Sequence, residues 1–205
     1  EFRRGANRSR FVLVPNFAIP FTFSNMSISI SVLSSGSKGN ATFIRAGRVG
    51  LLIDCGLGLR ALQKRLHAIG ENESSIDAVL VTHEHTDHVR GLRSMLKASS
   101  LESFMTGGTI DGSHADSFDL NASAIIPVIP GQTFTIADVE VDTFSVPHDA
   151  EEPVGFSIRH EGIKVTQLTD LGWIPDDVAD AMKGSDVLIL ESNHDLDMLR
   201  MGTYP

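Results

Sequence analysis

The sequence has one cysteine, few positive charges and no long hydrophobic run, and each shortage excludes a class of protein. Among its 205 residues Cys55 is the single cysteine, which excludes an internal disulfide and suits a reducing cytoplasm. Because Cys55 follows an apolar strand, we expect it to be a packing group rather than a nucleophile. The formal net charge of −9 argues against a general electrostatic grip on nucleic acid. No apolar run of about 18 residues could span a membrane. We therefore expect one soluble, cytoplasmic domain.

Residues 1–25 differ in pattern from the rest of the chain. Arginines precede an apolar stretch, as in a secretory signal, but Pro15 and Pro20 interrupt that stretch and no small-residue cleavage site follows. Met26 then begins a well-patterned strand. We expect residues 1–25 to be a non-native or disordered leader and residues 26–205 to form the domain. Because Tyr204 and Pro205 directly follow a helix-like stretch, we also expect the domain to be incomplete at its C-terminus.

The apolar pattern after Met26 predicts more strands than helices. Alternating or continuous apolar runs predict strands at 27–33, 41–46, 49–54, 76–82, 103–106, 125–129, 133–136, 139–146, 154–159, 164–169 and 187–191. Helical spacing predicts helices at 58–68 and 89–98, and Pro175 suits the first residue of a third helix that ends at Met182. Hairpins followed by strand–helix–strand units favour two sheets packed face to face with helices outside.

The most informative segment is the run from Thr82 to His88, which holds imidazoles and a carboxylate at metal-ligand spacing. On an extended chain, residues two apart point the same way, so His83 and His85 can bind one ion. Asp87 and His88 lie at the turn that follows and can face a second ion. The segment comes directly after a predicted buried strand, at the kind of strand end where open α/β sheets place active sites.

Two further residues stand in similar places. His148 follows the strand at 139–146, and Asp170 follows the strand at 164–169. Either residue alone is more often a loop residue satisfied by its neighbours. Beside the run from His83 to His88, they complete what a dinuclear hydrolytic site needs, which is a hard bridging carboxylate with imidazoles on each ion. His67, His114 and His160 lie in no comparable cluster of ligand-type residues in the sequence. We expect them to be surface or hydrogen-bonded residues.

The chain from Met26 to Pro205 resembles the metallo-β-lactamase-fold hydrolases in the order of its motifs. These motifs are Asp54, His83-x-His85-x-Asp87-His88, His148 and Asp170. The resemblance implies an α/β fold built as an αββα four-layer sandwich over residues 26–205. It also implies that His83, His85 and His148 hold one zinc ion, that Asp87 and His88 hold the other, and that Asp170 bridges them. Asp54 would then order the metal loop from behind the ligands.

The stretches 33–40 and 190–195 are similar to a bacterial branch of exonuclease-like members of this superfamily. Members normally supply a last histidine from a C-terminal segment, and His194 is the only later histidine in this sequence. We expect it to be either a stand-in ligand or a loop histidine near the cleft. The incomplete ligand set predicts weak occupancy of the second metal site.

The Ser- and Gly-rich loop at residues 34–40 has two interpretations. Its backbone N–H groups can face an anionic substrate, with Lys38 adding charge, or it is a flexible turn between strands. It is not a phosphate-binding P-loop, because the G-x-x-x-x-G-K-S/T spacing is missing.

The resemblance implies hydrolysis by a zinc-bound hydroxide on one or two ions, with Mn²⁺ or iron as alternative metals. We expect Asp87 and Asp170 to be the catalytic carboxylates, with Asp87 orienting the hydroxide. The branch favours phosphodiester substrates, as in a nuclease. The acidic net charge slightly favours the alternative, a hydrolase of esters, lactones or β-lactams. The missing ligand supports a third interpretation, an inactive or structural zinc-binding domain.

The expected partners follow from these interpretations. The substrate is either a small molecule or a nucleic acid, and a bound dinuclear centre would restore about four positive charges to an acidic chain. An incomplete sandwich leaves apolar surface and strand edges uncovered, so we expect a homo-oligomer.

Overall fold

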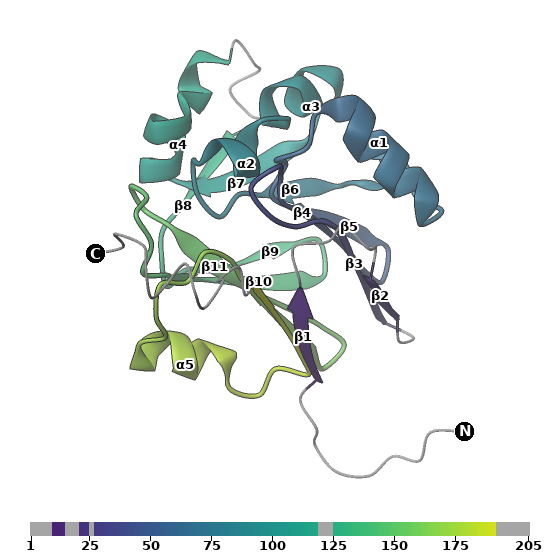
Figure 1. Ribbon diagram of the computed structural model, residues 1–205. Helices are drawn as coiled ribbons and strands as arrows, with labels where there is room; N and C mark the ends of the chain where they lie inside the picture. The colour runs from purple at the N-terminus through teal and green to yellow at the C-terminus, as the bar shows by residue number, and fades with distance from the viewer. Residues whose placement is uncertain (1–9, 15–20, 25–26, 119–124, 192–205) are drawn as a thin grey trace, which may run out of the picture.

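A computed structural model describes residues 10–14, 21–24, 27–118 and 125–191 of the chain (Figure 1). Of residues 10–14, 21–24 and Glu191 it fixes the backbone alone. In this part of the chain, two β-sheets form the middle of the molecule and helices lie outside them. None of the helices described is long and apolar enough to cross a membrane.

The first sheet holds the strands that lead into the His83–His88 segment, in the order β2-β3-β4-β5-β6-β7-β8. Strands β2 to β5 form an antiparallel meander, and β5 to β8 run parallel to one another. The bounds are β2 (Phe21–Ser24), β3 (Ile28–Ser34), β4 (Ala41–Ala46), β5 (Val49–Ile53), β6 (Ala78–Leu80), β7 (Glu102–Thr106) and β8 (Ile125–Val128).

The second sheet supplies His148 and Asp170, in the order β1-β13-β12-β11-β10-β9. Its strands β9 to β12 are antiparallel neighbours, whereas β13 runs parallel to both β12 and β1. The bounds are β1 (Arg10–Val14), β9 (Thr133–Ile136), β10 (Val139–Ser145), β11 (Val154–His160), β12 (Ile163–Leu168) and β13 (Val187–Glu191).

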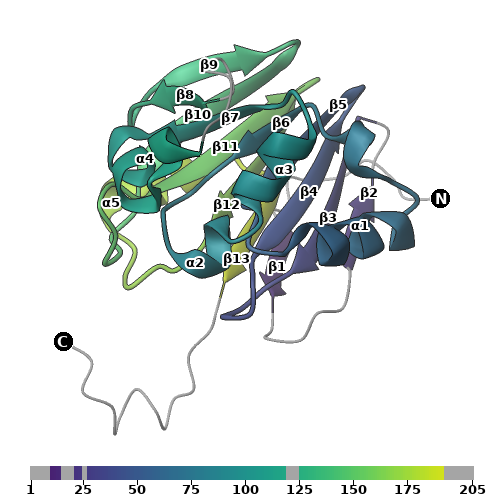
Figure 2. The ribbon, with the colours of Figure 1, turned by 90° about the horizontal axis from the view of Figure 1, so that it is seen from above.

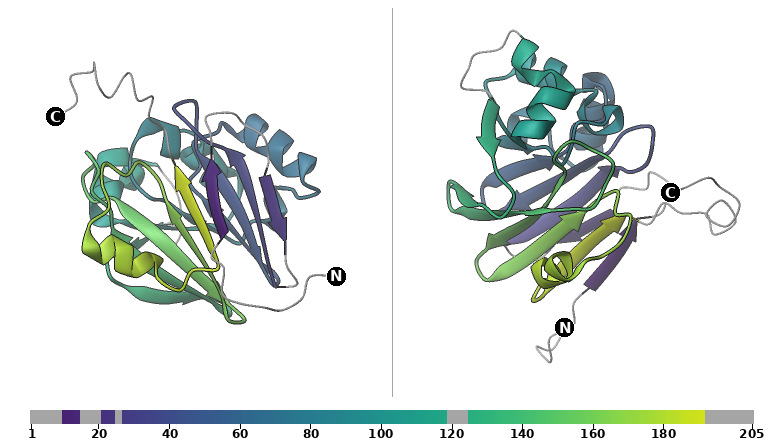
Figure 3. Two further views of the ribbon diagram at one scale, coloured as in Figure 1. Left: turned by 60° about the horizontal axis from the view of Figure 1, so that its bottom comes forward. Right: turned by 90° about the vertical axis from the view of Figure 1, so that its left-hand side faces the viewer.

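Apolar side chains fix the four layers. One core cluster fills the space between the sheets and includes Ile30, Leu51 and Phe156, each no more than 1% exposed. The opposite face of the first sheet packs against α1 (Leu59–Ala68), α3 (Leu92–Ala98) and α4 (Gly107–Ser113). The outer face of the second sheet is covered by α5 (Asp176–Met182) through Val178. Figure 1 and the right-hand view of Figure 3 show these helices on opposite sides of the paired sheets, and Figure 2 looks down onto α1, α3 and α4. This is the predicted αββα sandwich.

Successive residues of β5 show why the strands take this form. Leu51 and Ile53 face the core between the sheets, and Leu52 between them faces the helices. A strand alternates its side chains between two faces, so a strand covered on both sides is apolar throughout. The sequence pattern of the strands was therefore a reliable guide to them.

The helices near the metal segment differ from the prediction. The helix expected at 89–98 is two helices, α2 (Thr86–Val89) and α3, with Arg90 and Gly91 between them. A Cβ at Gly91 would lie 1.9 Å from the carbonyl oxygen of Leu57, so the backbone passes too close to the 54–58 loop for a larger residue. Asp87 and His88 consequently lie within α2 rather than in a turn before a helix.

Three other differences concern short elements. The strand expected at 76–82 is confined to β6, and helix α4 was not predicted because Gly107, Gly108 and Gly112 have poor helix propensity. Thr106 caps α4 by accepting a hydrogen bond from the Thr109 N–H. Strands β1 and β2 fall within the range 1–25 that the sequence pattern set apart as a leader. Whether that range is native stays a prediction.

Candidate metal centre

Five loops at one edge of the sandwich bring the candidate residues together. They follow β3, β5, β6, β10 and β12, and they carry Asn40, Asp54, the His83–His88 segment, His148 and Asp170. Each of the two sheets contributes loops, so neither sheet alone makes the site. The sheets are joined at this edge by the Val154 N–H, which donates to the Thr82 carbonyl oxygen at 2.9 Å.

The first group consists of His83, His85 and His148. His83 Nε2 lies 3.1 Å from His85 Nδ1, and His148 Nε2 lies 3.1 Å from the same atom. Tetrahedral zinc with Zn–N bonds of about 2.0–2.1 Å separates its nitrogen ligands by about 3.3 Å. The imidazoles of the first group are therefore already at the spacing of a metal site.

The second group consists of His83, His88 and Asp170. Asp170 Oδ2 lies 2.9 Å from His88 Nε2 and 3.8 Å from His83 Nε2. This oxygen is buried and accepts no well-oriented hydrogen bond among the described residues. Asp170 also has a φ of 53°, a left-handed conformation that is uncommon for residues other than glycine. A strained residue with an unsatisfied buried oxygen is typical of a functional site.

His83 belongs to both groups, so the two groups cannot both use it as a ligand at the same time. Its Nδ1 lies 3.0 Å from Thr82 Oγ1, so Nε2 is the nitrogen that faces the other ligands. One imidazole nitrogen has one lone pair and binds one ion. If His83 serves the first group, the second group needs another ligand. Asp87 is adjacent, with Oδ2 3.7 Å from His88 Nε2.

Asp54 holds the metal segment from behind. It is 0% exposed and accepts hydrogen bonds from the Thr82 N–H at 2.8 Å and from the Thr82 hydroxyl at 3.0 Å. Its Oδ2 lies 2.8 Å from His88 Nδ1, so the opposite nitrogen, Nε2, faces the second group. Such a carboxylate fixes the tautomer and direction of a ligand histidine. The role of Asp54 in ordering a metal loop, which the resemblance implied, stays a prediction.

Asn40 is a site residue that the sequence reasoning missed. It is 4% exposed, and its Nδ2 lies 3.2 Å from Asp87 Oδ2 and 2.8 Å from His88 Nε2. Its position at the end of a Ser- and Gly-rich loop was noted only for backbone N–H groups. No sequence signal distinguishes this amide from that of any other loop asparagine.

The electrostatics of the two groups differ in direction. Burial lowers the pKa of His83 to about 2 and also lowers the pKa of His148, with neighbouring imidazoles adding to both effects. Burial acts the same way on His88, but the carboxylates of Asp54 and Asp170 outweigh it and raise its pKa to about 10. Burial would raise the pKa of Asp170, yet the close approach and positive charge of the His88 imidazole hold it below its ordinary value.

Three backbone N–H groups of the loop at 34–40 are already used within the protein. The N–H groups of Gly36, Gly39 and Asn40 donate to Asn40 Oδ1, the Gly36 carbonyl and the Asp87 carbonyl, so they are not available to an anionic substrate. Lys38 is exposed at the tip of the loop. Arg90 lies beside it and donates from Nη1 to the Lys38 carbonyl at 3.0 Å.

The remaining histidines and the cysteine lie as follows. His67 and His114 are exposed, and His160 is 8% exposed with Nδ1 4.0 Å from Asp138. His194 lies outside the described residues. Cys55 is 0% exposed within the core under the helices, and burial, with the nearby charge of Asp54, raises the pKa of its thiol to about 12. These values agree with a packing role for Cys55.

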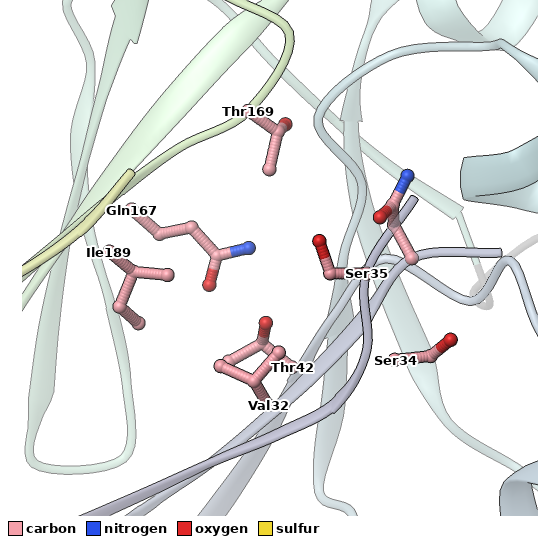
Figure 4. A pocket seen from close by; sticks show the side chains of 8 residues that line it. Val32, Ser34, Ser35, Thr42, Gln167, Thr169 and Ile189 are labelled. Atoms are coloured by element: carbon pink, nitrogen blue, oxygen red, sulfur yellow. The ribbon is translucent and has the colours of Figure 1, made fainter. Parts of the chain in front are cut away.

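A small pocket lined by hydroxyl, amide and aliphatic side chains lies between the two sheets beside the second group (Figure 4). Gln167 points into it from β12, toward Thr42 of β4 and Ser35 of the loop that follows β3. Gln167 Oε1 is buried and has no hydrogen-bond partner among the described residues. The pocket is lined by Val32, Ser34, Ser35, Asn40, Thr42, Gln167, Thr169 and Ile189. It contains no charged side chain and suits a water molecule bound through hydroxyl and amide groups.

Comparison with known proteins identifies the class. Residues 50–205 match the beta-lactamase superfamily domain. The chain therefore belongs to the beta-lactamase superfamily and is a hydrolytic metalloenzyme with the metallo-β-lactamase fold.

Among its relatives, exodeoxyribonuclease YycJ of Bacillus anthracis is 33% identical over 180 residues, which are 88% of this chain and 68% of that protein. Exodeoxyribonuclease WalJ of Streptococcus pneumoniae serotype 2 is 28% identical over 193 residues, with the same coverage of 88% and 68%. The chain thus spans about two thirds of the length of these relatives. Ribonuclease Z of Mycobacterium bovis is 34% identical over 140 residues, covering 65% of this chain and 42% of that protein.

Solved structures agree on the fold. Zn²⁺-bound PqqB from Methylobacterium extorquens has a TM-score of 0.64 and 22% identity, covering 81% of this chain and 64% of that one. The metallo-β-lactamase fold protein YhfI from Bacillus subtilis has a TM-score of 0.64 and 18% identity, covering 83% and 73%. At these identities the likeness shows the fold alone.

The fold implies a divalent metal, and the residues of both groups fit one. The first group offers imidazoles at ligand spacing, and the second offers the buried, unsatisfied oxygen of Asp170. Nitrogen and carboxylate ligands suit zinc, manganese and iron.

Proposed function

We propose that this chain hydrolyses phosphodiester bonds of nucleic acid with zinc held at the two groups. The observation that carries the proposal is the pair of adjoining groups that meet at His83. A pair of bound divalent ions would suit phosphodiester hydrolysis, because such ions stabilise the charge on the attacking and leaving oxygens. The relatives named as exodeoxyribonucleases support the same substrate class.

The chain's own residues have distinct parts in this proposal. His83, His85 and His148 would hold the first ion, and His88, Asp87 and Asp170 the second. A bound zinc ion supplies Lewis acidity and makes a water molecule in the site more acidic. Asp170 Oδ2 lies within 3.8 Å of both His83 Nε2 and His88 Nε2, so it would be within reach of both positions. Asp87, which is partly exposed, is placed to accept a proton or orient water at the open side.

Lys38 and Arg90 form the proposed phosphate contact. Both side chains are exposed, and Arg90 is held against the backbone of Lys38, on the side of the site that carries Asp87. Together they put positive charge beside an otherwise acidic protein, where a strand's phosphates would approach. We expect the double variant K38A/R90A to raise KM for DNA, to leave kcat nearly unchanged and to reduce the salt dependence of binding.

The test is a substrate panel on the full chain. Hydrolysis is measured with added Zn²⁺ or Mn²⁺ and again after chelation. The substrates are single-stranded DNA, double-stranded DNA, a chromogenic phosphodiester, an aryl ester and a chromogenic β-lactam. We expect metal-dependent cleavage of DNA. H85A and D170A should each lose more than about 100-fold in turnover, beyond the usual effect of an outer-shell partner. H160A is the matched control and should be near neutral.

Two results would contradict the proposal. One is turnover of the ester or the β-lactam with no cleavage of DNA, which moves the protein to carbonyl substrates. The other is DNA cleavage that survives both chelation and the two ligand substitutions, which moves the chemistry away from this site.

A further inference from the structure

The side-chain amide of Asn40 is fixed in direction by its own loop. Its Oδ1 accepts a hydrogen bond from the Gly36 N–H at 2.7 Å. A backbone N–H is a donor only, so the oxygen end of the amide must face Gly36 and the Nδ2 end must face the metal segment. The assignment of the two ends therefore follows from hydrogen bonding.

The Nδ2 end reaches two residues of the second metal position. It lies 3.2 Å from Asp87 Oδ2 and 2.8 Å from His88 Nε2. His88 Nε2 has one lone pair, so an ion and an amide N–H exclude each other there. The Asp87 carboxylate has lone pairs for both. With an ion bound to His88, Asp87 is the partner that the amide keeps.

The backbone of Asn40 is tied to the same segment. Its N–H donates to the Asp87 carbonyl at 2.7 Å, and its carbonyl accepts from the Gly56 N–H at 2.9 Å. A Cβ at Gly56 would lie 1.6 Å from the Asp87 carbonyl oxygen, so the three segments are packed too closely for a side chain between them. Asp87 is thus held through both its backbone and its carboxylate.

We propose that Asn40 is a positioning residue for the second metal position, whose amide holds the Asp87 carboxylate beside His88 and Asp170. The proposal rests on the metal centre of the proposed function but not on the substrate. It makes the affinity of the second position depend on a side chain that binds no metal itself.

The test measures Zn²⁺ binding rather than turnover. Zn²⁺ is titrated by calorimetry into metal-free wild type, N40A and S37A. S37A is the control, because Ser37 is an exposed position in the same loop. Spectra of the Co²⁺-bound proteins report the ligand sets. We expect N40A to weaken the second position by about 10–100-fold, the range for partners that orient ligands, and to leave the first unchanged. S37A should match wild type. The first position serves as an internal control for folding.

A double-mutant cycle separates positioning from general structure. If the amide acts through Asp87, then adding N40A to D87A should weaken the second position by less than about threefold. N40S keeps a polar side chain too short to reach Asp87; it should behave like N40A and replaces it if N40A does not fold.

The proposal is overturned if N40A binds Zn²⁺ at the second position as tightly as wild type does. If N40A does not fold, the same comparison is made with N40S. The proposal is also overturned by an undiminished loss in the D87A background, or by a wild type that binds one ion at every Zn²⁺ concentration. Failure of the proposed function is read separately. A wild type that binds two ions with the expected Asn40 dependence but cleaves no DNA would keep this inference and remove the nuclease.

Discussion

His88 and His148 are oriented by the same chemistry in opposite surroundings. A carboxylate lies behind Nδ1 of each ring, Asp54 at 2.8 Å for His88 and Asp149 at 3.0 Å for His148. The Asp54 side chain is 0% exposed and the Asp149 side chain is 89% exposed. Water and salt therefore weaken the pair at His148 but not the pair at His88. The second group depends on buried support, whereas the first depends on its own imidazoles and on the joining of the two sheets.

The largest expected effect comes from removing and restoring metal. The first group has a complete set of imidazoles, while the second shares His83 with it. We therefore expect the first equivalent of Zn²⁺ to add about 4 kcal/mol to the free energy of unfolding when free Zn²⁺ is about 1,000 times Kd. The second equivalent should add less. Denaturation in metal buffers measures both, and elemental analysis after dialysis should find at least one retained ion. Equal steps, or a folded protein that retains no metal, would break the comparison.

The next effect tests the two supporting carboxylates directly. D54N leaves the Thr82 N–H or His88 Nδ1 without its charged acceptor in a buried place, so we expect a loss of about 2–4 kcal/mol in the metal-free protein. D149N, the exposed counterpart, should lose less than about 0.5 kcal/mol. Urea denaturation of both variants provides the measurement. Similar losses would mean that burial does not distinguish the two groups.

A smaller effect concerns how the sheets are joined at the first group. Glu84 lies between His83 and His85, and its Oε1 accepts a hydrogen bond from the Glu151 N–H at 2.8 Å, in the loop that carries His148. We expect E84A to weaken Zn²⁺ at the first group by about tenfold and to leave the second group nearly unchanged. E84Q keeps an acceptor oxygen and is the matched control. Calorimetry that finds E84Q as weak as E84A would assign the effect to charge instead.

The smallest effect comes from an ion pair at the opposite end of β4. Arg45 Nη2 lies 2.7 Å from Glu71 Oε2. Slight burial opposes ionisation of Glu71, but hydrogen bonds from Arg45 and Ser75 and the charge of Arg45 lower its pKa from 4.5. A lowered folded-state pKa stabilises the protein above the ordinary value, and the benefit is lost as the pH falls through the folded-state value.

E71Q should therefore lose about 0.5 kcal/mol at pH 7, and the difference from wild type should vanish in acid. The loss of stability in E71Q should be the same with and without Zn²⁺, because the Arg45–Glu71 pair is remote from both groups of metal-binding residues. A metal-dependent difference would link this end of the sheet to the site.

The sequence predicted the parts of the fold that repeat a pattern. Strands such as β4 and β13 were located at their observed bounds, because most of their residues are apolar, as expected for strands covered on both faces. It could not predict the break at Gly91, which depends on how closely the Leu57 carbonyl approaches from another loop. Helix α4 was missed for a related reason. Its glycines are poor helix formers, and close contacts such as that of Gly112 with Glu84 depend on the assembled fold.

The candidate site divides in the same way. His83, His85 and His88 lie in one short segment, so their spacing in the sequence predicted that they would be close together. His148 and Asp170 were singled out because each follows a predicted strand in a chain that already holds the His83–His88 run, and the structure places both beside that segment. Asn40 was not found, since its importance depends on a single amide direction that Gly36 determines. Their roles as metal ligands, and the oligomeric state, stay predictions.

Cys55 gives this site a built-in reporter of its own opening. Its N–H donates to the His88 carbonyl at 2.7 Å and its carbonyl accepts from the Gly91 N–H at 2.7 Å, while its side chain is buried in the core between the first sheet and its helices. A thiol reagent can react with it only in molecules in which this part of the core has opened, because the closed form keeps the thiol buried and protonated. Since the sequence has no other cysteine, the labelling rate of the unmodified protein measures how often this edge of the sandwich comes apart.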